Sequence, residues 1–442
     1  MSLSPVEKND RHQVNLYLAT LFCLLILAFA TFSVVGRGSR DTFGSLDTIA
    51  LLKVGTRALS AMILTFFLLQ NWSQPGRKSV LKKWLWLVPF VLWAGATVQW
   101  SALKSVSIGQ LASTTVLMAV CLSVGIQSNR GELWKKVLRN LALILLATSA
   151  ALLAIHFVFP GWDAFERQGS GILHPTNAGA TASLGLLLLV ACRMTWGWRW
   201  VRLIWIPGVV IHLAALMFAA NRVSFFLALV LPFIPTLAFA NRKRLAMVSV
   251  AGCAVALGFL FLDPGFESLG ETGDKVVNFV QREQSAKQIK SLSGREEMWK
   301  AMWQSHKESP IKGHGYFVTS ETGRLKVWDE WGNWTAHNMF LHCLTTTGVI
   351  GAVLFFGSNS LIFLYFVGAW IKKRLPTRLF VALATFYLWY LVWGLFNSSV
   401  LGPLQPESLL FYSLVGIGLG VSAKEAPCPQ VSESDAIGEV TA

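Results

Sequence analysis

The chain has 442 residues, of which 54% are hydrophobic and 14% are charged. Because soluble domains carry about 25% charged residues, this composition excludes an ordinary soluble globular protein. The net charge of +15 comes from basic residues that gather in alternate loops. That distribution is typical of a polytopic membrane protein, so no nucleic acid partner is predicted. The six cysteines are scattered without a CxxC pair, so the sequence predicts neither a disulfide framework nor a metal site.

Long apolar runs predict an all-α membrane protein with about 12 spans, because roughly 20 apolar residues cross a hydrocarbon core about 30 Å thick. The first run is too long for the apolar core of a cleavable signal peptide, so we expect it to remain as a span. The predicted spans are 15–35, 48–70, 84–100, 107–126, 138–158, 177–192, 203–220, 223–240, 245–262, 339–369, 379–396 and 408–422.

Lysines and arginines are concentrated in every second loop between these spans, whereas the short intervening loops hold few. The positive-inside rule therefore predicts that the basic loops and both termini are cytoplasmic. The basic loops are 77–83, 130–139, 193–202, 242–244 and 372–378.

The predicted topology divides the chain into four parts. Residues 1–262 hold spans 1 to 9, 263–336 form a large outer loop, 337–423 hold spans 10 to 12, and 424–442 form a polar cytoplasmic tail that we expect to be disordered. The outer loop is too long for an ordinary connection, and such loops are usually functional. We therefore expect it to cover a site on the outer face.

Part of the outer loop is predicted to be helical. Ser293 and Glu296 have the spacing of a capping box, and the apolar residues that follow recur on one face of a helix. A second segment, 275–292, mixes apolar and charged residues and is predicted to be an interfacial helix. The apolar face of the first helix consists of Met298, Trp299, Met302 and Trp303.

Charged side chains within or beside spans are the first candidates for function, since each costs a few kcal/mol at the bilayer centre. Lys53 and Arg57 lie four residues apart toward the outer end of the second span, on one helical face. Arg222 lies between the seventh and eighth spans, where the chain reaches the outer face with almost no polar loop. The alternative for each is that the long side chain only reaches out to lipid headgroups.

Arg295 opens the predicted helix of the outer loop. A guanidinium beside a helix N-terminus suits an anionic ligand, because it can converge with backbone N–H groups on one phosphate. The segment 309–315 predicts a Pro/Gly turn, and His314 within it is a secondary site candidate. For Gly313 and Gly315 we favour simple turn geometry over a role in a site.

His337 and Asn338 precede the tenth span, just after Trp331 and Trp334, which suit a membrane interface. Thr335 is predicted to cap this helix and to place His337 in its first turn, where the helix dipole disfavours the protonated ring. A neutral histidine can accept a proton, as a general base must. The alternative is a structural histidine at the interface.

Two further candidates, His174 and Asn177, precede the sixth span on the outer side. Either side chain could line a site, but Pro175 and Asn177 also make an ordinary helix start. The sequence has no Walker A loop, no GxGxxG and no paired carboxylates within the spans.

Four features, in order, resemble the O-antigen ligase and O-antigen polymerase family of integral membrane proteins. They cover roughly 171–351 together with the segment 175–179, which resembles the family's Asn-containing helix start. The four features are Arg222 after span 7, Gly294-Arg295-x-x-x-Trp299, Ser309-Pro310-x-x-Gly313-x-Gly315, and His337-Asn338 followed after nine residues by Gly348-x-x-Gly351.

The resemblance implies a fold similar to that of metal-independent, lipid-linked (GT-C-like) glycosyltransferases, with no cofactor. It implies an enzyme of the Gram-negative inner membrane that works at the periplasmic face. The donor would be an undecaprenyl diphosphate-linked O-antigen glycan and the acceptor a sugar hydroxyl of lipid A core. In that family the His of the His-Asn pair is essential and arginines hold the diphosphate, which implies these roles for His337, Arg222 and Arg295. Asn338, Lys53, Arg57, His174, Asn177 and His314 remain secondary candidates.

One departure bears on the acceptor. Related protein O-oligosaccharyltransferases often have an extra His a few residues before the His-Asn pair, and 331–336 has none, which argues against a protein acceptor. Two alternatives to the ligase stay open. A polymerase of the same family would join repeat units with much the same residues, and a lipid-linked oligosaccharide transporter would also need about 12 spans, although no repeated halves are evident.

Overall fold

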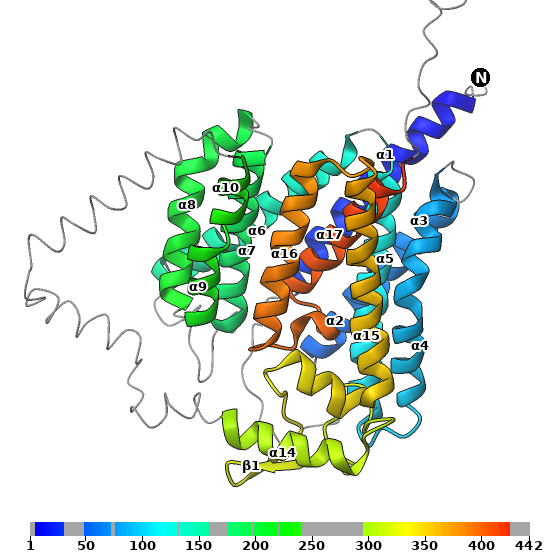
Figure 1. Ribbon diagram of the computed structural model, residues 1–442, viewed down its shortest axis with the longest axis vertical. Coiled ribbons are helices and arrows are strands. Elements are labelled where there is room, and N and C mark those ends of the chain that lie inside the picture. The colour runs from blue at the N-terminus through cyan, green and yellow to red at the C-terminus, as the bar shows by residue number, and fades with distance from the viewer. Residues whose placement is uncertain are drawn as a thin grey trace, which may run out of the picture.

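The computed structural model describes residues 5–30, 48–71, 76–130, 132–158, 175–195, 199–219, 221–239 and 295–424 (Figure 1). These residues form helices and one antiparallel hairpin, in which Lys326 pairs with Trp331. The elements are α1 Pro5–Ala30, α2 Thr48–Gln70, α3 Arg77–Trp84, η1 Leu85–Leu87, α4 Val88–Thr97, α5 Lys104–Ser128, α6 Leu133–Val158, α7 Pro175–Thr195, α8 Arg199–Ala219, α9 Arg222–Val230, α10 Phe233–Phe239, α14 Arg295–Glu308, β1 Leu325–Val327, β2 Glu330–Gly332, α15 Met339–Ile371, α16 Thr377–Gly394, η2 Ser399–Leu401 and α17 Pro406–Ser422.

Among the described residues, 7 helical stretches are long and apolar enough to cross a membrane, and shorter apolar helices occur in α1, α2 and α17. They confirm the predicted all-α membrane class, while the number of spans stays a prediction. The predicted span 245–262 and the predicted helix 275–292 lie outside the described residues. The 7 stretches are Lys104–Ser128, Leu133–Val158, Thr176–Arg193, Val201–Ala219, Arg222–Phe239, Met339–Ile371 and Thr377–Gly394.

Several helices extend beyond the apolar runs that predicted them, and the largest extensions are at α1 and α3. α1 begins at Pro5, whereas its predicted span begins at residue 15. α3 begins at Arg77, before the predicted span 84–100. The added turns contain Lys, Arg and Glu, which favour helix as strongly as most apolar residues do. Apolarity therefore marks the part of a helix suited to lipid, and not where the helix ends.

α17 lies inside the bundle and is buried on all sides, as expected for a short helix that is apolar all round. It packs against α5 at very close range. A Cβ placed on Gly416 would lie 2.4 Å from the carbonyl oxygen of Cys121, and one on Gly420 would lie 2.2 Å from that of Gly125. Small residues four apart permit this approach of two helix backbones, which is a common way to pack helices in membranes.

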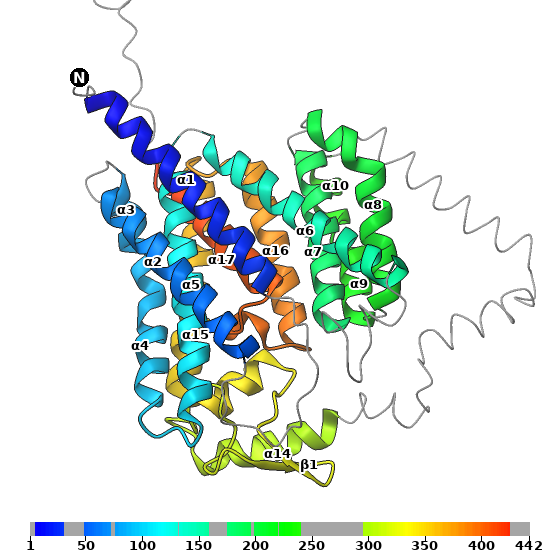
Figure 2. The same ribbon diagram turned by 180° about the vertical axis from the view of Figure 1, so that it is seen from behind.

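The two ends of the bundle differ. The N-terminal end of α1 and the basic helix α3 lie at one end, and α14 with the β1–β2 hairpin lies beyond the other (Figures 1 and 2). We call the latter the α14 end. α7, α8, α9 and α10 form a group of helices beside the rest of the bundle, and the start of α9 points toward the α14 end (Figures 1 and 2).

Candidate functional site

The amphipathic helix predicted in the outer loop is α14, and its inner face packs on the segments that lead into α15. Met298 and Met302 are fully buried, in one apolar cluster with Val327 and Ala336. Trp303, the fourth residue of the predicted apolar face, is 48% exposed. On a helix Trp303 lies about 140° from Met298, so it falls outside the buried stripe. Ser293 of the predicted capping box lies outside the described residues.

α15 is interrupted at Gly348, which has φ 67° and ψ −175°, a conformation nearly restricted to glycine. The turn 309–315 fills this interruption, and four backbone hydrogen bonds join the two segments. They run from His314 N to Thr345 O (3.2 Å), from Gly315 N to Thr346 O (2.9 Å), from Val349 N to Pro310 O (2.8 Å) and from Ile350 N to Ile311 O (3.4 Å).

Side chains satisfy two further carbonyls that the interruption exposes. Trp93 Nε1 of α4 donates to Thr347 O (2.8 Å), and His306 Nδ1 of α14 lies 3.1 Å from Leu344 O. Buried backbone polar groups need hydrogen-bond partners, so a broken helix is stable in the interior only when other protein groups replace the lost bonds. Two motifs that are separate in the sequence, 309–315 and Gly348-x-x-Gly351, are thus one structural unit.

The glycines of this unit do more than form a turn. Gly313 does have the positive φ expected of a turn, 68°. In addition, a Cβ on Gly313 would lie 2.5 Å from the backbone N of Gly348, and a Cβ on Gly348 would lie 2.1 Å from the carbonyl oxygen of Ile311. Close contact between the two backbones is therefore a second reason that glycine occupies both positions.

The first turn of α15 differs from the prediction in its cap. Asn338, and not Thr335, is the N-cap: its Oδ1 accepts a hydrogen bond from Leu341 N (3.0 Å), as asparagine at this position commonly does. His337 consequently lies one residue before the cap, outside the helix, with a positive φ of 46°. Asn338 has a structural role, and His337 is held in a strained backbone conformation next to a helix N-terminus.

Arg295 and His337 are brought into one region by Trp299. Arg295 is the first residue of α14, and Trp299 follows one turn later. Trp299 Nε1 donates to the carbonyl oxygen of Ala336 (2.7 Å), the residue immediately before His337. A direct hydrogen bond therefore joins Trp299 of the Gly-Arg-x-x-x-Trp motif to the residue that precedes the His-Asn motif.

Tyr316 anchors the same region to the membrane bundle. Its backbone N–H donates to Thr97 Oγ1 (2.9 Å), and its carbonyl accepts from Ser107 Oγ (2.7 Å). Its hydroxyl bonds to Thr114 Oγ1 (2.8 Å) and to the carbonyl of Leu401. Burial raises the pKa of this phenol well above its usual value of 10, so Tyr316 acts as a neutral hydrogen-bonding group.

The predicted secondary candidate His314 is buried beneath α14. Its Nε2 lies 2.8 Å from the carbonyl oxygen and 3.0 Å from Oγ of Ser305. These contacts tie the turn 309–315 to α14, so the side chain serves the structure of the region.

Arg57 lies in α2, and its Nη1 donates to the carbonyl of Gly109 in α5 at 3.4 Å. This bond links two helices of the bundle. Lys53 lies four residues earlier in α2, but its side chain is outside the described part of the chain, as is the whole of His174.

Asn177 and Arg222 form a second group. Arg222 is the first residue of α9, and the preceding Asn221 caps that helix by accepting from Ser224 N (3.0 Å). A Cβ on Gly179 would lie 2.8 Å from Cβ of Asn221, so the first turns of α7 and α9 touch. The segment that holds Asn177 and the segment that holds Arg222 are therefore adjacent.

A family model described as O-antigen ligase matches residues 207–356. That segment contains Arg222, Arg295 and His337, and both halves of the interruption in α15. This match supports an O-antigen ligase family assignment for the chain. A search of the curated proteins finds no match.

Members of the O-antigen ligase family are glycosyltransferase-like enzymes of the membrane, and the family implies that a lipid-linked glycan takes part. Within the domain, Arg295 and His337 belong to one group and Arg222 to the other, at the start of α9, which points toward the α14 end (Figure 1). Within the described ranges no three His, Cys, Asp or Glu residues gather as a metal site would require.

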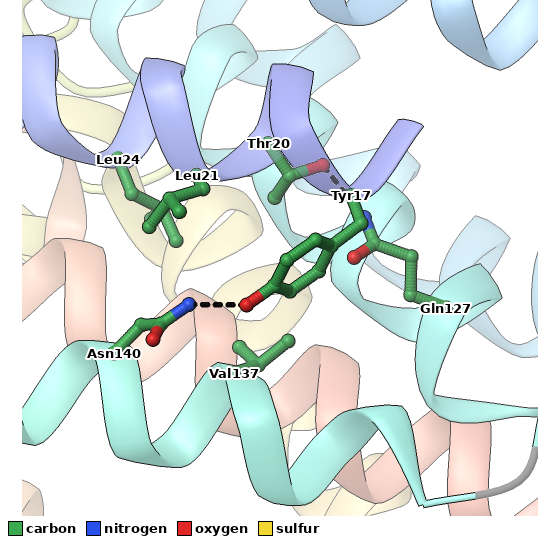
Figure 3. A pocket seen from close by; sticks show the side chains of 7 residues that line it. All are labelled: Tyr17, Thr20, Leu21, Leu24, Gln127, Val137 and Asn140. Carbon is green, nitrogen blue, oxygen red and sulfur yellow. Dashed lines mark hydrogen bonds between the residues drawn. The ribbon is translucent and has the colours of Figure 1, made fainter. Parts of the chain in front are cut away.

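A small cavity of ≈ 10 Å³ lies between α1, α5 and α6 (Figure 3). Tyr17 and Asn140 point toward each other across it and share a 2.6 Å hydrogen bond, and Gln127 Nε2 donates to Thr20 Oγ1 (2.6 Å). The cavity has room for about one water molecule. The cavity adjoins the last turn of α5, whereas the candidate site adjoins the first turn, so the cavity is no part of the candidate site.

His342 and Glu407 are among the buried titratable residues that the sequence did not identify as candidates. His342 lies in the first turns of α15 and Glu407 in the first turn of α17, and both are 0% exposed. For His342 the signal was present in the sequence, since an ionisable residue within an apolar run is a candidate by default, whereas Glu407 lies just before the predicted span 408–422. Among charged residues within the spans, only lysine and arginine were predicted as candidates.

Proposed function

We propose that this chain is an O-antigen ligase, which transfers a glycan from undecaprenyl diphosphate to a sugar hydroxyl of lipid A core at the periplasmic face of the inner membrane. The observation that supports it is the family match over 207–356, which includes all three residues of the inferred chemistry. The hydrogen bond between Trp299 and Ala336 supports it further, because it joins the segments of Arg295 and His337.

In the proposed reaction His337 is the general base. Its ring accepts the proton of the acceptor hydroxyl while that oxygen attacks the anomeric carbon of the donor. The bond from this carbon to the diphosphate oxygen breaks, and the electron pair leaves with the diphosphate. A single displacement of this kind inverts the anomeric configuration.

Arg222 and Arg295 bind the diphosphate in this proposal. Each lies at the first position of its helix, where the positive end of the helix dipole adds to the attraction for an anion. Guanidinium groups bind phosphate through two parallel hydrogen bonds, and they stabilise the negative charge that develops as the sugar leaves. The described part of the outer loop, 295–336, would limit access of competing water.

The test uses purified full-length protein reconstituted in lipid with undecaprenyl diphosphate-linked glycan and lipid A core, without divalent metal. His337→Ala is compared with His156→Ala, which removes a half-buried histidine from the last turn of α6. We expect His337→Ala to lower transfer about 10²- to 10⁴-fold, the usual loss of a general base, and His156→Ala to transfer as the wild type does. Arg295→Ala is compared with Arg324→Ala, an exposed arginine of the same loop.

Four outcomes would count against parts of the proposal. Growth of the donor glycan in place of transfer to lipid A core would identify a polymerase. Movement of the donor across the membrane without transfer would identify a transporter. A retained anomeric configuration in the product would refute the single displacement. A folded His337→Ala protein as active as the wild type would refute the base assignment.

A further inference from the structure

The peptide unit of Ala336 is held from both sides. Its carbonyl oxygen accepts from Trp299 Nε1 (2.7 Å), and its N–H donates to Nδ1 of His342 in a long hydrogen bond (3.5 Å). Ala336 is itself 0% exposed. One contact from α14 and one from α15 therefore fix the backbone that leads directly into His337.

The backbone of His337 requires such support. Its φ of 46° is unfavourable for a residue with a Cβ, and such conformations persist only where the surrounding structure imposes them. On the C-terminal side, Asn338 imposes it by capping α15. On the N-terminal side, the contacts of Trp299 and His342 with Ala336 do so.

The surroundings of His342 suit a neutral side chain that holds a neighbouring peptide group. Its ring is 0% exposed and packs edge-on against Phe317, with ring centroids 4.6 Å apart. Charge on a fully buried ring is unfavourable, and acceptance of a peptide N–H by Nδ1 places the ring proton on Nε2. Nε2 has no hydrogen-bond partner among the described residues. Nδ1, the one nitrogen able to accept, is already occupied.

A histidine used only for packing would not need to accept a hydrogen bond from the N–H of Ala336, as His342 does. The backbone N–H of His342 also donates to the carbonyl of Asn338 (2.9 Å), the first bond of the helix. One residue thus reaches the chain on both sides of His337, through its backbone to Asn338 and through its ring to Ala336.

We propose that His342 is a positioning residue for His337, whose Nδ1 holds the Ala336 peptide and so aims the ring of the base at the acceptor hydroxyl. The inference rests on the proposed function, in which His337 removes the acceptor proton. It assigns His342 no contact with either lipid. Its loss should therefore slow the chemical step and leave binding of both lipids unchanged.

The test compares His342→Leu with His342→Asn in the full-length reconstituted protein. Leucine is apolar and cannot accept, whereas the Oδ1 of asparagine lies close to where Nδ1 lies in histidine. We expect His342→Leu to lower kcat about 10- to 100-fold, the scale of a small misplacement of a reacting group, with KM for donor and acceptor unchanged within about twofold. His342→Asn should recover most of kcat.

Two further measurements exclude a merely structural role. In a His337→Ala background, His342→Leu should cause no additional loss, because it acts through the missing ring. Amide hydrogen exchange of the segment 331–338 should accelerate in His342→Leu and not in His342→Asn, whether or not the protein is active.

The outcomes separate this inference from the proposed function. A folded His342→Leu protein with wild-type kcat, an equal loss in the Leu and Asn variants, or a loss that adds to His337→Ala would overturn the positioning role. If the wild type transfers nothing, the proposed function fails and the catalytic part of the inference fails with it. Unchanged exchange in His342→Leu would then also refute the claim that His342 holds the loop.

Discussion

Replacing Gly348 by alanine tests whether the interruption of α15 organises the candidate site. The added Cβ would lie 2.1 Å from the carbonyl oxygen of Ile311, which is backbone and cannot swing away. Gly357 in the same helix offers a matched control, because a Cβ there would meet nothing within 4 Å. Both changes add one methyl group to one helix, and only the first disturbs the turn 309–315.

The structure gives the size of the effect. A non-glycine residue at φ 67°, ψ −175° costs about 1–3 kcal/mol. Displacing the turn would also weaken the two hydrogen bonds that Val349 and Ile350 donate to it, at about 0.5–1.5 kcal/mol each. Gly348→Ala should therefore destabilise the protein by about 2–6 kcal/mol. Gly357→Ala should stabilise its helix by up to about 1 kcal/mol, since alanine is the better helix former.

The assay is thermal unfolding of the purified protein in detergent, followed by tryptophan fluorescence, together with the transfer reaction. We expect Gly348→Ala to unfold at a clearly lower temperature, and to lose transfer even where it is folded, because the loop before His337 would shift. Gly357→Ala should match or exceed the wild type in stability and transfer normally. Equal stability of the two variants would show that the close contact at Gly348 is not a structural requirement, and would refute the argument.

Three further predictions concern contacts around the site and in the bundle. Trp299→Phe removes the hydrogen bond to the loop before His337 and should lower kcat about tenfold or more. Trp303→Phe, on the exposed side of α14, should leave kcat unchanged. Equal kcat in the two variants would contradict this prediction. Because burial raises the pKa of Tyr316 above its unfolded value of about 10, its stabilising contribution is complete below that pH and is lost as pH rises through the folded pKa. Thermal unfolding between about pH 8 and pH 11 should show a steeper alkaline loss in the wild type than in Tyr316→Phe, and parallel curves would refute it. Gly185→Ala places a Cβ 2.2 Å from the ring of His212 in α8 and should lower the free energy of unfolding by about 1–3 kcal/mol. Gly109→Ala is the control, because a Cβ there meets nothing within 4 Å. The prediction is wrong if both variants unfold at the same temperature.

The sequence was sufficient for features that each helix carries by itself. A helix satisfies its own backbone hydrogen bonds, so an apolar run of membrane length predicts a span without knowledge of its neighbours. α2, α5, α6 and α15 lie where their runs predicted them. The amphipathic pattern likewise located α14, and the order of the motifs indicated the family that the match over 207–356 supports.

Contacts between distant segments were decided by the tertiary structure. The sequence placed the cap of α15 at Thr335, whereas Asn338 forms it, because the bend before the helix is held by His342 and Trp299 from outside that segment. In the sequence, 309–315 and Gly348 are separate motifs. In the structure, backbone groups of the turn 309–315 pair with backbone groups on either side of Gly348. Bonds between backbones far apart in the chain leave no periodic pattern in the side chains. For that reason the sequence predicted the helices and the residues of the candidate site, and only the folded structure determined how those residues are held.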